Sequence, residues 1–281
     1  MTIAQAVSCA VALGCITAIL KPTVGSQDGD LSTCTTRTGA IARAAQLYWS
    51  ANDDRLPPAV SDFRVECEDQ QLLAMHILPY HGNWMNYRCP ADWAAEHALN
   101  IDACNRNETP PKNLATRIVT WSQKSHRGYN HLMLSPIVFT GSPPLQMEPS
   151  APVEFRQIAN PARTIMFVDS LNDVRSDGAP TGGGSWLVDA PCMRGSNMAQ
   201  IMPLPRVISG YRWMGGWSLG TPARHKHGYA YQWHEKRFLV AMVDGVVKIL
   251  SFDEITAGCE PRRYSAGPAY DLEAYLWDIV K

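Results

Sequence analysis

The pattern of apolar and polar positions divides the chain into three regions: an apolar stem, an amphipathic segment and a long body. The stem comprises residues 1–22, and its apolar run, 3–20, stops before Pro22. As a helix this run would be about 27 Å long, which just reaches the hydrocarbon thickness of a bilayer. We therefore expect a single membrane-spanning or filament-forming segment. A secretory signal is the alternative, although its start lacks basic residues.

The second region, residues 23–58, contains a predicted amphipathic helix over 31–52. Small and apolar side chains recur there every three or four residues, and Arg37 and Arg43 lie on the opposite face. Pro57-Pro58 ends any continuation of the helix. The small side chains favour close packing of this helix against a sheet or a second helix.

The third region, residues 59–281, is predicted to consist mainly of strands and loops. The runs 116–122 and 164–169 are rich in β-branched and aromatic residues and are predicted strands. Residues 272–281 have the spacing of a short amphipathic helix. The segment 177–185 contains three consecutive glycines and is predicted to be a mobile loop. It lacks the Lys-Ser/Thr that follows the glycines of a phosphate-binding loop.

A β-hairpin is predicted where the apolar runs 238–243 and 246–252 flank Asp244-Gly245. A two-residue type I′ turn needs positive φ at both central positions, and Asp-Gly adopts it readily. The dipeptide is therefore interpreted as turn chemistry.

Charge and cysteine content narrow the function classes. The formal net charge is −1 and the pI is about 6.7, so no nucleic-acid partner is expected. Of the eight cysteines, Cys9 and Cys15 lie in the stem, and no CxxC pair occurs. The other six favour an oxidising compartment with up to three disulfides, and six cysteines allow fifteen pairings. Buried free thiols in a cytosolic protein are the alternative.

Five groups of residues follow one another in a defined order. Two are the stem, with Gln5 and Lys21-Pro22, and the helix that opens at Cys34 and ends with Tyr48 and Pro57-Pro58. The third group consists of Leu78-Pro79-Tyr80, Asn83-Trp84 and Arg88-Cys89-Pro90-Ala91-Asp92. The fourth consists of Gly128-Tyr129-Asn130 and residues 160–170. The fifth consists of Arg224-His225 and Asp244-Gly245. In this order they resemble the bacterial prepilin-type, or pseudopilin-like, proteins that carry a processing-associated H-x9-DG domain.

The resemblance implies an α+β, pilin-like fold, in which a long N-terminal helix packs on an antiparallel β-sheet with long loops. It implies a non-enzymatic structural subunit of a type II secretion or type IV pilus system. Other pilin-like subunits or the secretion machinery would be its partners. The chain would cross the cytoplasmic membrane once, with its body in the periplasm or outside the cell. No cofactor and no catalytic residue are expected.

Three features depart from the family pattern. No leader with a prepilin peptidase site precedes Met1, so we expect either an upstream start or a route to the membrane without that peptidase. Gln5 replaces the glutamate that neutralises the terminal amine of a neighbouring subunit, so weaker assembly or a minor, tip-located subunit is expected. His234 meets the H-x9-DG spacing to Asp244, whereas the Arg-His context of the family lies at Arg224-His225. Either histidine could fill the family position.

The resemblance also implies a disulfide between Cys34 and Cys89, because both belong to family-like groups. Cys67–Cys104 and Cys192–Cys259 would then be additional bridges of this chain.

Two sets of side chains are candidate metal ligands, and neither is favoured. The oxygen-rich candidates for calcium are Asp169, Asn172, Asp173 and Asp177. Their spacing differs from the EF-hand template, so a solvated loop is the preferred interpretation. The candidate zinc ligands are His225, His227 and His234. Because the sequence shows no partner set for them, surface or hairpin-packing roles are preferred.

A second function stays open, that of a surface-anchored glycan- or protein-binding module. Exposed tryptophans stack on sugars or on partner proteins. The candidates are Trp186, Trp213, Trp217 and Trp233. Burial in the core is the competing interpretation, because Trp is highly buried on average.

Overall fold

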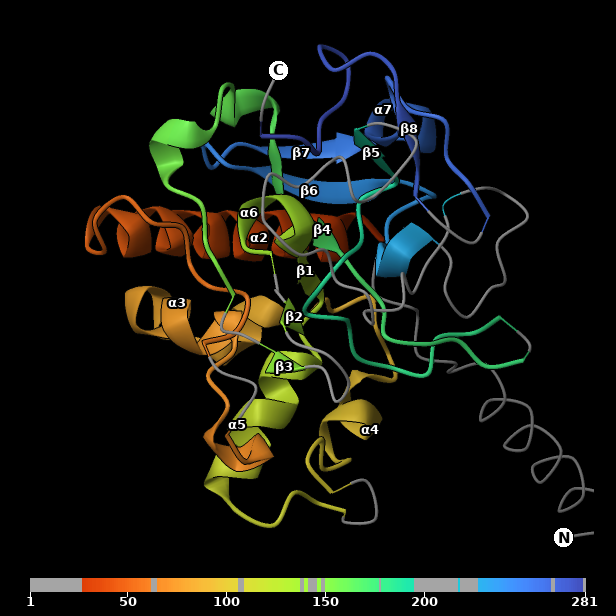
Figure 1. Ribbon diagram of the computed structural model, residues 1–281. Helices are drawn as coiled ribbons and strands as arrows, with labels where there is room; N and C mark the ends of the chain where they lie inside the picture. Colours follow the sequence, from red (N-terminus) through yellow and green to blue (C-terminus); the bar gives the residue numbers. More distant parts are fainter. Residues whose placement is uncertain are drawn as a thin grey trace, which may run out of the picture.

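The structure is a computed structural model in which helices and an antiparallel sheet form one mixed fold (Figure 1). It describes residues 27–61, 65–105, 109–136, 139–140, 146–147, 150–176, 178–194, 217, 227–263 and 266–279. The predicted stem, including Gln5 and Pro22, lies outside these residues. None of the described helices combines the length and the apolar character needed to cross a membrane.

The described elements alternate between short helices and short strands after one long helix. The helices are α2 (Gln27–Ser50), α3 (Leu73–His81), α4 (Ala95–Leu99), α5 (Leu114–Gln123), α6 (His131–Leu134) and α7 (Phe252–Ile255). The 3-10 helices are η1 (Cys67–Asp69), η2 (Trp84–Tyr87), η3 (Phe155–Gln157) and η4 (Pro161–Arg163). The strands are β1 (Arg127–Tyr129), β2 (Phe139–Thr140), β3 (Gln146–Met147), β4 (Ile165–Asp169), β5 (Cys192–Arg194), β6 (Phe238–Met242), β7 (Val247–Leu250) and β8 (Gly267–Ala269).

The central sheet has the strand order β1-β4-β6-β7, and every neighbouring pair is antiparallel. The predicted strand over 164–169 is confirmed as β4, and the predicted hairpin is confirmed as β6 and β7. At its tip Gly245 has φ +87°, and Asp244 Oδ1 accepts a hydrogen bond from Val246 N at 3.0 Å. Asp244 is not among the residues with positive φ, so the turn is not the predicted two-residue type I′ turn; Gly245 N donates to the carbonyl of Met242 at 2.9 Å instead. The Asp-Gly signal therefore placed the turn but not its type.

Helix α2 packs across one face of the sheet, where it contacts β4, β6 and β7, and it contacts α3 and η2 with its remaining surface (Figure 1). Side chains of β6 alternate between the two faces, as the period of a strand requires. Ala241 belongs to the apolar cluster that includes Ile41 of α2, whereas Val240 belongs to a second cluster with Trp217 on the opposite face. Both faces of the sheet are thus covered.

The predicted helix over 31–52 is confirmed as α2, which begins four residues earlier and ends two residues earlier. Its end is fixed by Asp53 and Asp54, which both have positive φ, of 53° and 58°. Asn52 Nδ2 donates to the carbonyl of Tyr48 at 2.7 Å and so satisfies an acceptor of the last turn.

The predicted strand over 116–122 is wrong, because these residues lie in α5. Asn113 caps the helix: its Oδ1 accepts from Thr116 N at 2.9 Å. Thr116, Val119 and Thr120 are buried at helical spacing. The packing of this face overrides the β-propensity of the run.

The predicted helix over 272–281 is also wrong for its described part, which forms turns up to residue 279. Ile165 N donates to the carbonyl of Leu276 at 2.7 Å, and Ala159 N donates to the carbonyl of Ile279 at 2.8 Å. The backbone of this segment is thus bonded to other parts of the chain, and Tyr275 is fully buried.

Two of the predicted disulfides are confirmed, Cys67–Cys104 and Cys192–Cys259, with Cα–Cα distances of 5.5 and 5.9 Å.

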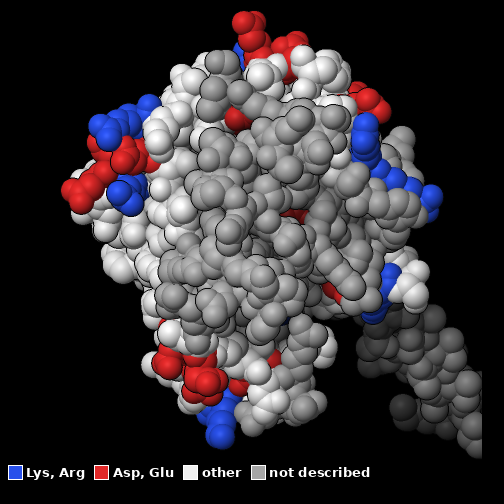
Figure 2. All heavy atoms as spheres, viewed as in Figure 1, with Lys and Arg blue, Asp and Glu red and all other residues white. Residues whose placement is uncertain are grey.

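On the face shown in Figure 2, the described acidic and basic side chains lie interspersed around the rim, which fits the near-zero net charge.

Candidate functional site

Seven polar or ionisable side chains are buried together where α2, the loop after η2 and the edge of the central sheet meet. None of them exposes more than 6% of its surface. We call this group the buried polar centre. Its members are Cys34, Cys89, Asp92, His126, Arg127, Asp169 and His234. Burial of so many polar groups requires that they satisfy one another.

Local structure explains how distant segments deliver these side chains. Cys34 lies on the buried side of α2 and packs with Leu239 of β6. Arg127 opens β1 and is the cross-strand partner of Asp169, which ends β4. His234 lies in the segment before β6, where Arg237 N donates to its carbonyl at 2.8 Å and closes a turn.

The Arg127–Asp169 ion pair places one positive and one negative charge inside the buried polar centre. Arg127 Nη1 donates to Asp169 Oδ1, and both side chains are fully buried. Arg127 also donates to the carbonyls of His126, at 3.3 Å, and of Cys34, at 3.5 Å. Burial raises the pKa of Asp169 to about 7, although the charge of Arg127 opposes this. The guanidinium thus ties α2 to the sheet edge.

Two thiols lie against this ion pair. Cys34 Sγ and Cys89 Sγ are 2.9 Å apart, and Cys89 Sγ lies 3.7 Å from His234 Nε2. The hydrogen bond from Cys89 lowers the pKa of Cys34 to about 4, with help from His234 and Arg127 and against the effect of burial. The same bond, together with burial, raises the pKa of Cys89. The pair therefore favours one thiolate, on Cys34, and one thiol.

The predicted Cys34–Cys89 disulfide stays a prediction. The fold brings the two sulfur atoms together, but both cysteines are free here, and a bond would shorten their separation to about 2.05 Å.

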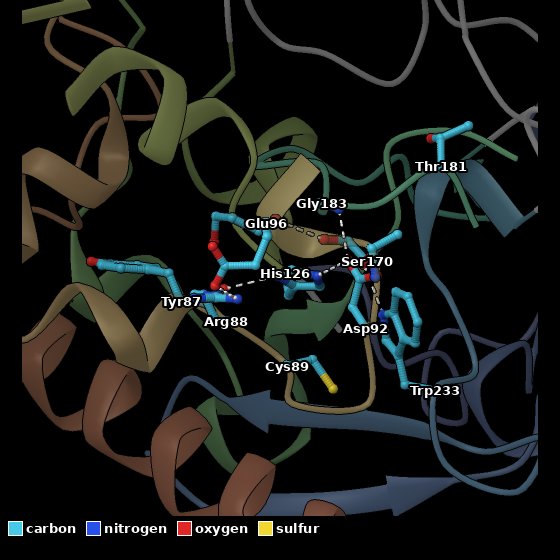
Figure 3. A network of polar contacts seen from close by, with 12 residues as sticks. Tyr87, Arg88, Cys89, Asp92, Glu96, His126, Ser170, Thr181, Gly183 and Trp233 are labelled. Atoms are coloured by element: carbon cyan, nitrogen blue, oxygen red, sulfur yellow. Dashed lines mark hydrogen bonds and ion pairs between the residues drawn. The ribbon is translucent and has the colours of Figure 1, made fainter. Parts of the chain in front are cut away.

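The second half of the centre is a carboxylate–imidazole pair (Figure 3). Asp92 Oδ2 lies 2.8 Å from His126 Nε2 and accepts from Gly183 N at 2.6 Å, and Asp92 Oδ1 accepts from Ala94 N at 3.0 Å. Burial alone would raise the pKa of Asp92, but the bonds from His126, Gly183 and Ala94 lower it overall. His126 Nδ1 faces the carbonyl of Tyr87 at 3.2 Å.

The geometry of the Asp92–His126 pair suits a structural role, in which it connects segments of the chain, better than proton transfer. Both nitrogens of His126 face acceptors within the protein, so neither is directed at a nucleophile. Trp233 packs beside the imidazole, with ring centroids 5.7 Å apart, and its Nε1 donates to the carbonyl of Ser170 at 3.0 Å (Figure 3). The arrangement joins the loop after η2 to β1, to the end of β4 and to the glycine-rich segment.

The structure brings together Cys34, Cys89, Asp92 and Asp169, from three of the five family-like groups, and His234, which meets the H-x9-DG spacing. Asn130 has a structural role, since its Nδ2 donates to the carbonyls of Ile165 and Trp277. The hydroxyl of Tyr129 donates to the carbonyl of Pro57 at 3.2 Å. Pro90 is exposed, Asp244 and Gly245 form the hairpin tip, and His225 lies outside the described residues.

The calcium and histidine interpretations need correction. Asp169 is not part of a solvated loop, because it is fully buried against Arg127. Asp173 Oδ1 accepts from Val174 N at 2.8 Å, and Asp177 lies outside the described residues. Of the two roles predicted for the histidines, surface or hairpin packing, the surface role is wrong for His234, since this residue is 6% exposed.

The structure also corrects the glycine-rich loop. Gly184 N donates to the carbonyl of Lys124 at 2.9 Å, and Asn172 N donates to the carbonyl of Gly183 at 3.0 Å. This part of the segment is packed against its neighbours.

Sequence reasoning missed His126 and Arg127. The one available signal was two ionisable residues directly before Gly128-Tyr129-Asn130, at the start of a strand whose residues are all buried. Their partners lie 34 and 42 residues away, so no local pattern could have identified them.

Comparison of the chain with models of known protein families, with curated proteins and with solved structures found no match. The family resemblance therefore depends on the sequence groups alone and stays a prediction.

Proposed function

We propose that this chain is a non-enzymatic, pseudopilin-like structural subunit of a secretion or pilus-type system. In this proposal residues 3–20 anchor it in the cytoplasmic membrane, and the body lies on the outer side. Its partners would be other pilin-like subunits or the secretion machinery.

The observation that carries the proposal is the position of α2. This helix lies lengthwise between the antiparallel sheet on one side and α3 and η2 on the other, and it begins at Gln27, shortly after the apolar run. A helix that is fixed along its length transmits a pull on the stem to the whole body. The two disulfides add support, because such bonds persist in oxidising compartments.

Enzymatic and binding functions have less support. A surface cavity of about 370 Å³ is lined by Asp173, Tyr231 and Lys236 among others, and it does not include the Asp92–His126 pair. Of the candidate tryptophans, Trp217 is fully buried, and Trp186 and Trp233 are partly buried, so stacking on a glycan is not favoured. Trp213 lies outside the described residues.

Membrane fractionation of the full chain in a Gram-negative host tests the proposal. We expect the chain to stay in the membrane after an alkaline wash and its body to be cleaved by protease added to spheroplasts. Deletion of residues 1–22 should release it. Amine-reactive cross-linking in membranes should give a weak ladder of oligomers that Gln5→Glu strengthens. An intact chain in the alkaline supernatant would contradict the anchor, and a monomer both before and after Gln5→Glu would contradict the subunit role.

A further inference from the structure

We propose that Cys34, Cys89 and His234 form a binding site for a thiophilic divalent metal ion, best matched by zinc, with Asp169 as the fourth ligand. Within the described part of the chain, these three residues are the only group of His, Cys, Asp and Glu side chains whose ligand atoms lie within 4.8 Å of one another. The site would join α2, the loop after η2 and the segment before β6.

The distances are close to those of a tetrahedral zinc site. With Zn–S bonds of about 2.3 Å and Zn–N bonds of about 2.0 Å, ligand sulfur and nitrogen atoms lie about 3.5 Å apart. The distance from Cys89 Sγ to His234 Nε2 is 3.7 Å, and that from His234 Nε2 to Asp169 Oδ2 is 3.6 Å. The sulfur pair, now 2.9 Å apart, would have to open by about 0.9 Å on binding. The Asp169 carboxylate lies outside the group of ligand atoms within 4.8 Å of one another, so it would have to move closer to the sulfurs to complete the site.

A second, independent observation points to a ligand at this place. Asp169 Oδ2 is buried and has no hydrogen-bond partner among the described residues. Its other oxygen, Oδ1, is held by Arg127, which orients the carboxylate and leaves Oδ2 directed at His234. A buried acceptor without a partner is costly, and a bound cation would satisfy it.

Charge balance favours a divalent ion. Two cysteine thiolates neutralise a dication, and Arg127 neutralises Asp169, so the ion, its four ligands and Arg127 together would carry no net charge. A neutral group of paired charges is the condition under which burial is tolerated. Arg127 thus acts as a positioning and neutralising residue behind the ligands.

The ligand set selects the kind of metal. Two sulfurs, one imidazole nitrogen and one carboxylate oxygen suit zinc, whereas calcium and magnesium require oxygen ligands. All four donors come from the protein and are buried, as in zinc sites that stabilise a fold. The inference stands apart from the proposed structural role, since metal content is measured on the purified chain without assembly.

The test is the metal content of the full chain, purified in mild detergent without chelator after expression in zinc-supplemented medium. Elemental analysis should give about one zinc per chain, and alkylation mapping after acid release should find Cys34 and Cys89 as thiols. Cobalt substitution should produce a thiolate-to-cobalt charge-transfer band. Cys34→Ser and His234→Ala should each reduce bound zinc at least tenfold, whereas His97→Ala, at an exposed histidine, should leave it unchanged.

Three results would overturn the proposal. One is a Cys34–Cys89 disulfide in the zinc-supplemented protein, because the same sulfurs cannot serve both purposes. The second is zinc binding that persists in His234→Ala, and the third is the absence of zinc from the unmodified chain when both thiols are free. If Cys34→Ser fails to fold, the conservative His234→Gln variant and the cobalt spectrum of the unmodified chain decide the question.

Discussion

Asp92 shows how a single buried charge is stabilised in this protein. Its two oxygens accept bonds from His126, Gly183 and Ala94, and these donors lower its pKa although burial opposes them. A carboxylate with a lowered pKa contributes stability that is complete above its unfolded pKa of about 3.9 and is lost as the pH falls through the folded value. Asp92 is therefore expected to be one of the acid-sensitive residues of the fold.

We predict that Asp92→Asn lowers the free energy of unfolding at pH 7 by about 1–3 kcal/mol, because it weakens a buried, charge-assisted network. Below pH about 4 the difference from the unmodified protein should shrink, since protonation removes the same charge there. Urea unfolding followed by circular dichroism between pH 3 and pH 7 measures both effects. The exposed Asp53→Asn serves as control. A difference that grows on acidification would contradict this account.

At the same scale, burial is what the sequence could not reveal. The pattern identified Cys34, Cys89, Asp92, Asp169 and His234 as motif positions, but it placed Asp169 in a solvated loop and gave His234 a surface or hairpin-packing role. Their environment depends on Arg127 and on α2, which are close only in the folded chain. A residue type indicates which chemistry is available, and tertiary packing decides which partners it meets.

At the scale of elements, prediction succeeded where a local signal agreed with the packing. The hairpin at Asp244-Gly245, strand β4 and helix α2 each had the expected period. The strand predicted over 116–122 is wrong because the β-branched residues of this run also have helical spacing, and the cap at Asn113 selects the helix. The mobility predicted for the glycine-rich segment is wrong for another reason. Its glycines let two backbone segments approach each other closely.

Gly184 and Gly39 provide a matched pair of substitutions. A Cβ at Gly184 would lie 2.0 Å from the carbonyl oxygen of Ser125, whereas a Cβ at Gly39 would meet only side-chain atoms, at 3.3 Å or more. We expect Gly184→Ala to destabilise the protein by about 3 kcal/mol through overpacking. Gly39→Ala, inside α2, should be neutral or stabilise it by up to about 1 kcal/mol. Thermal unfolding compares the two, and equal effects would contradict the packed arrangement of this segment.

At the scale of the whole molecule, the central sheet unites two apolar clusters. Met166 and Phe167 of β4 belong to the cluster that includes α2, while Ile165 and Val168 belong to the cluster with Trp217 and Trp277. Because adjacent residues of one strand serve both clusters, neither can be lost without disrupting the other. The described fold should therefore unfold as one cooperative unit.

The disulfide Cys192–Cys259 tests this cooperativity, because it closes a span of 67 residues on the side of the second cluster. We expect the double variant Cys192→Ser/Cys259→Ser to lower the free energy of unfolding by about 2–4 kcal/mol, chiefly by freeing the unfolded chain. The transitions reported by tryptophan fluorescence and by far-ultraviolet circular dichroism should still coincide, since the shared sheet still couples both clusters. Separate midpoints would show that the two clusters are independent units that the disulfide holds together, and the sheet would then not be the source of cooperativity.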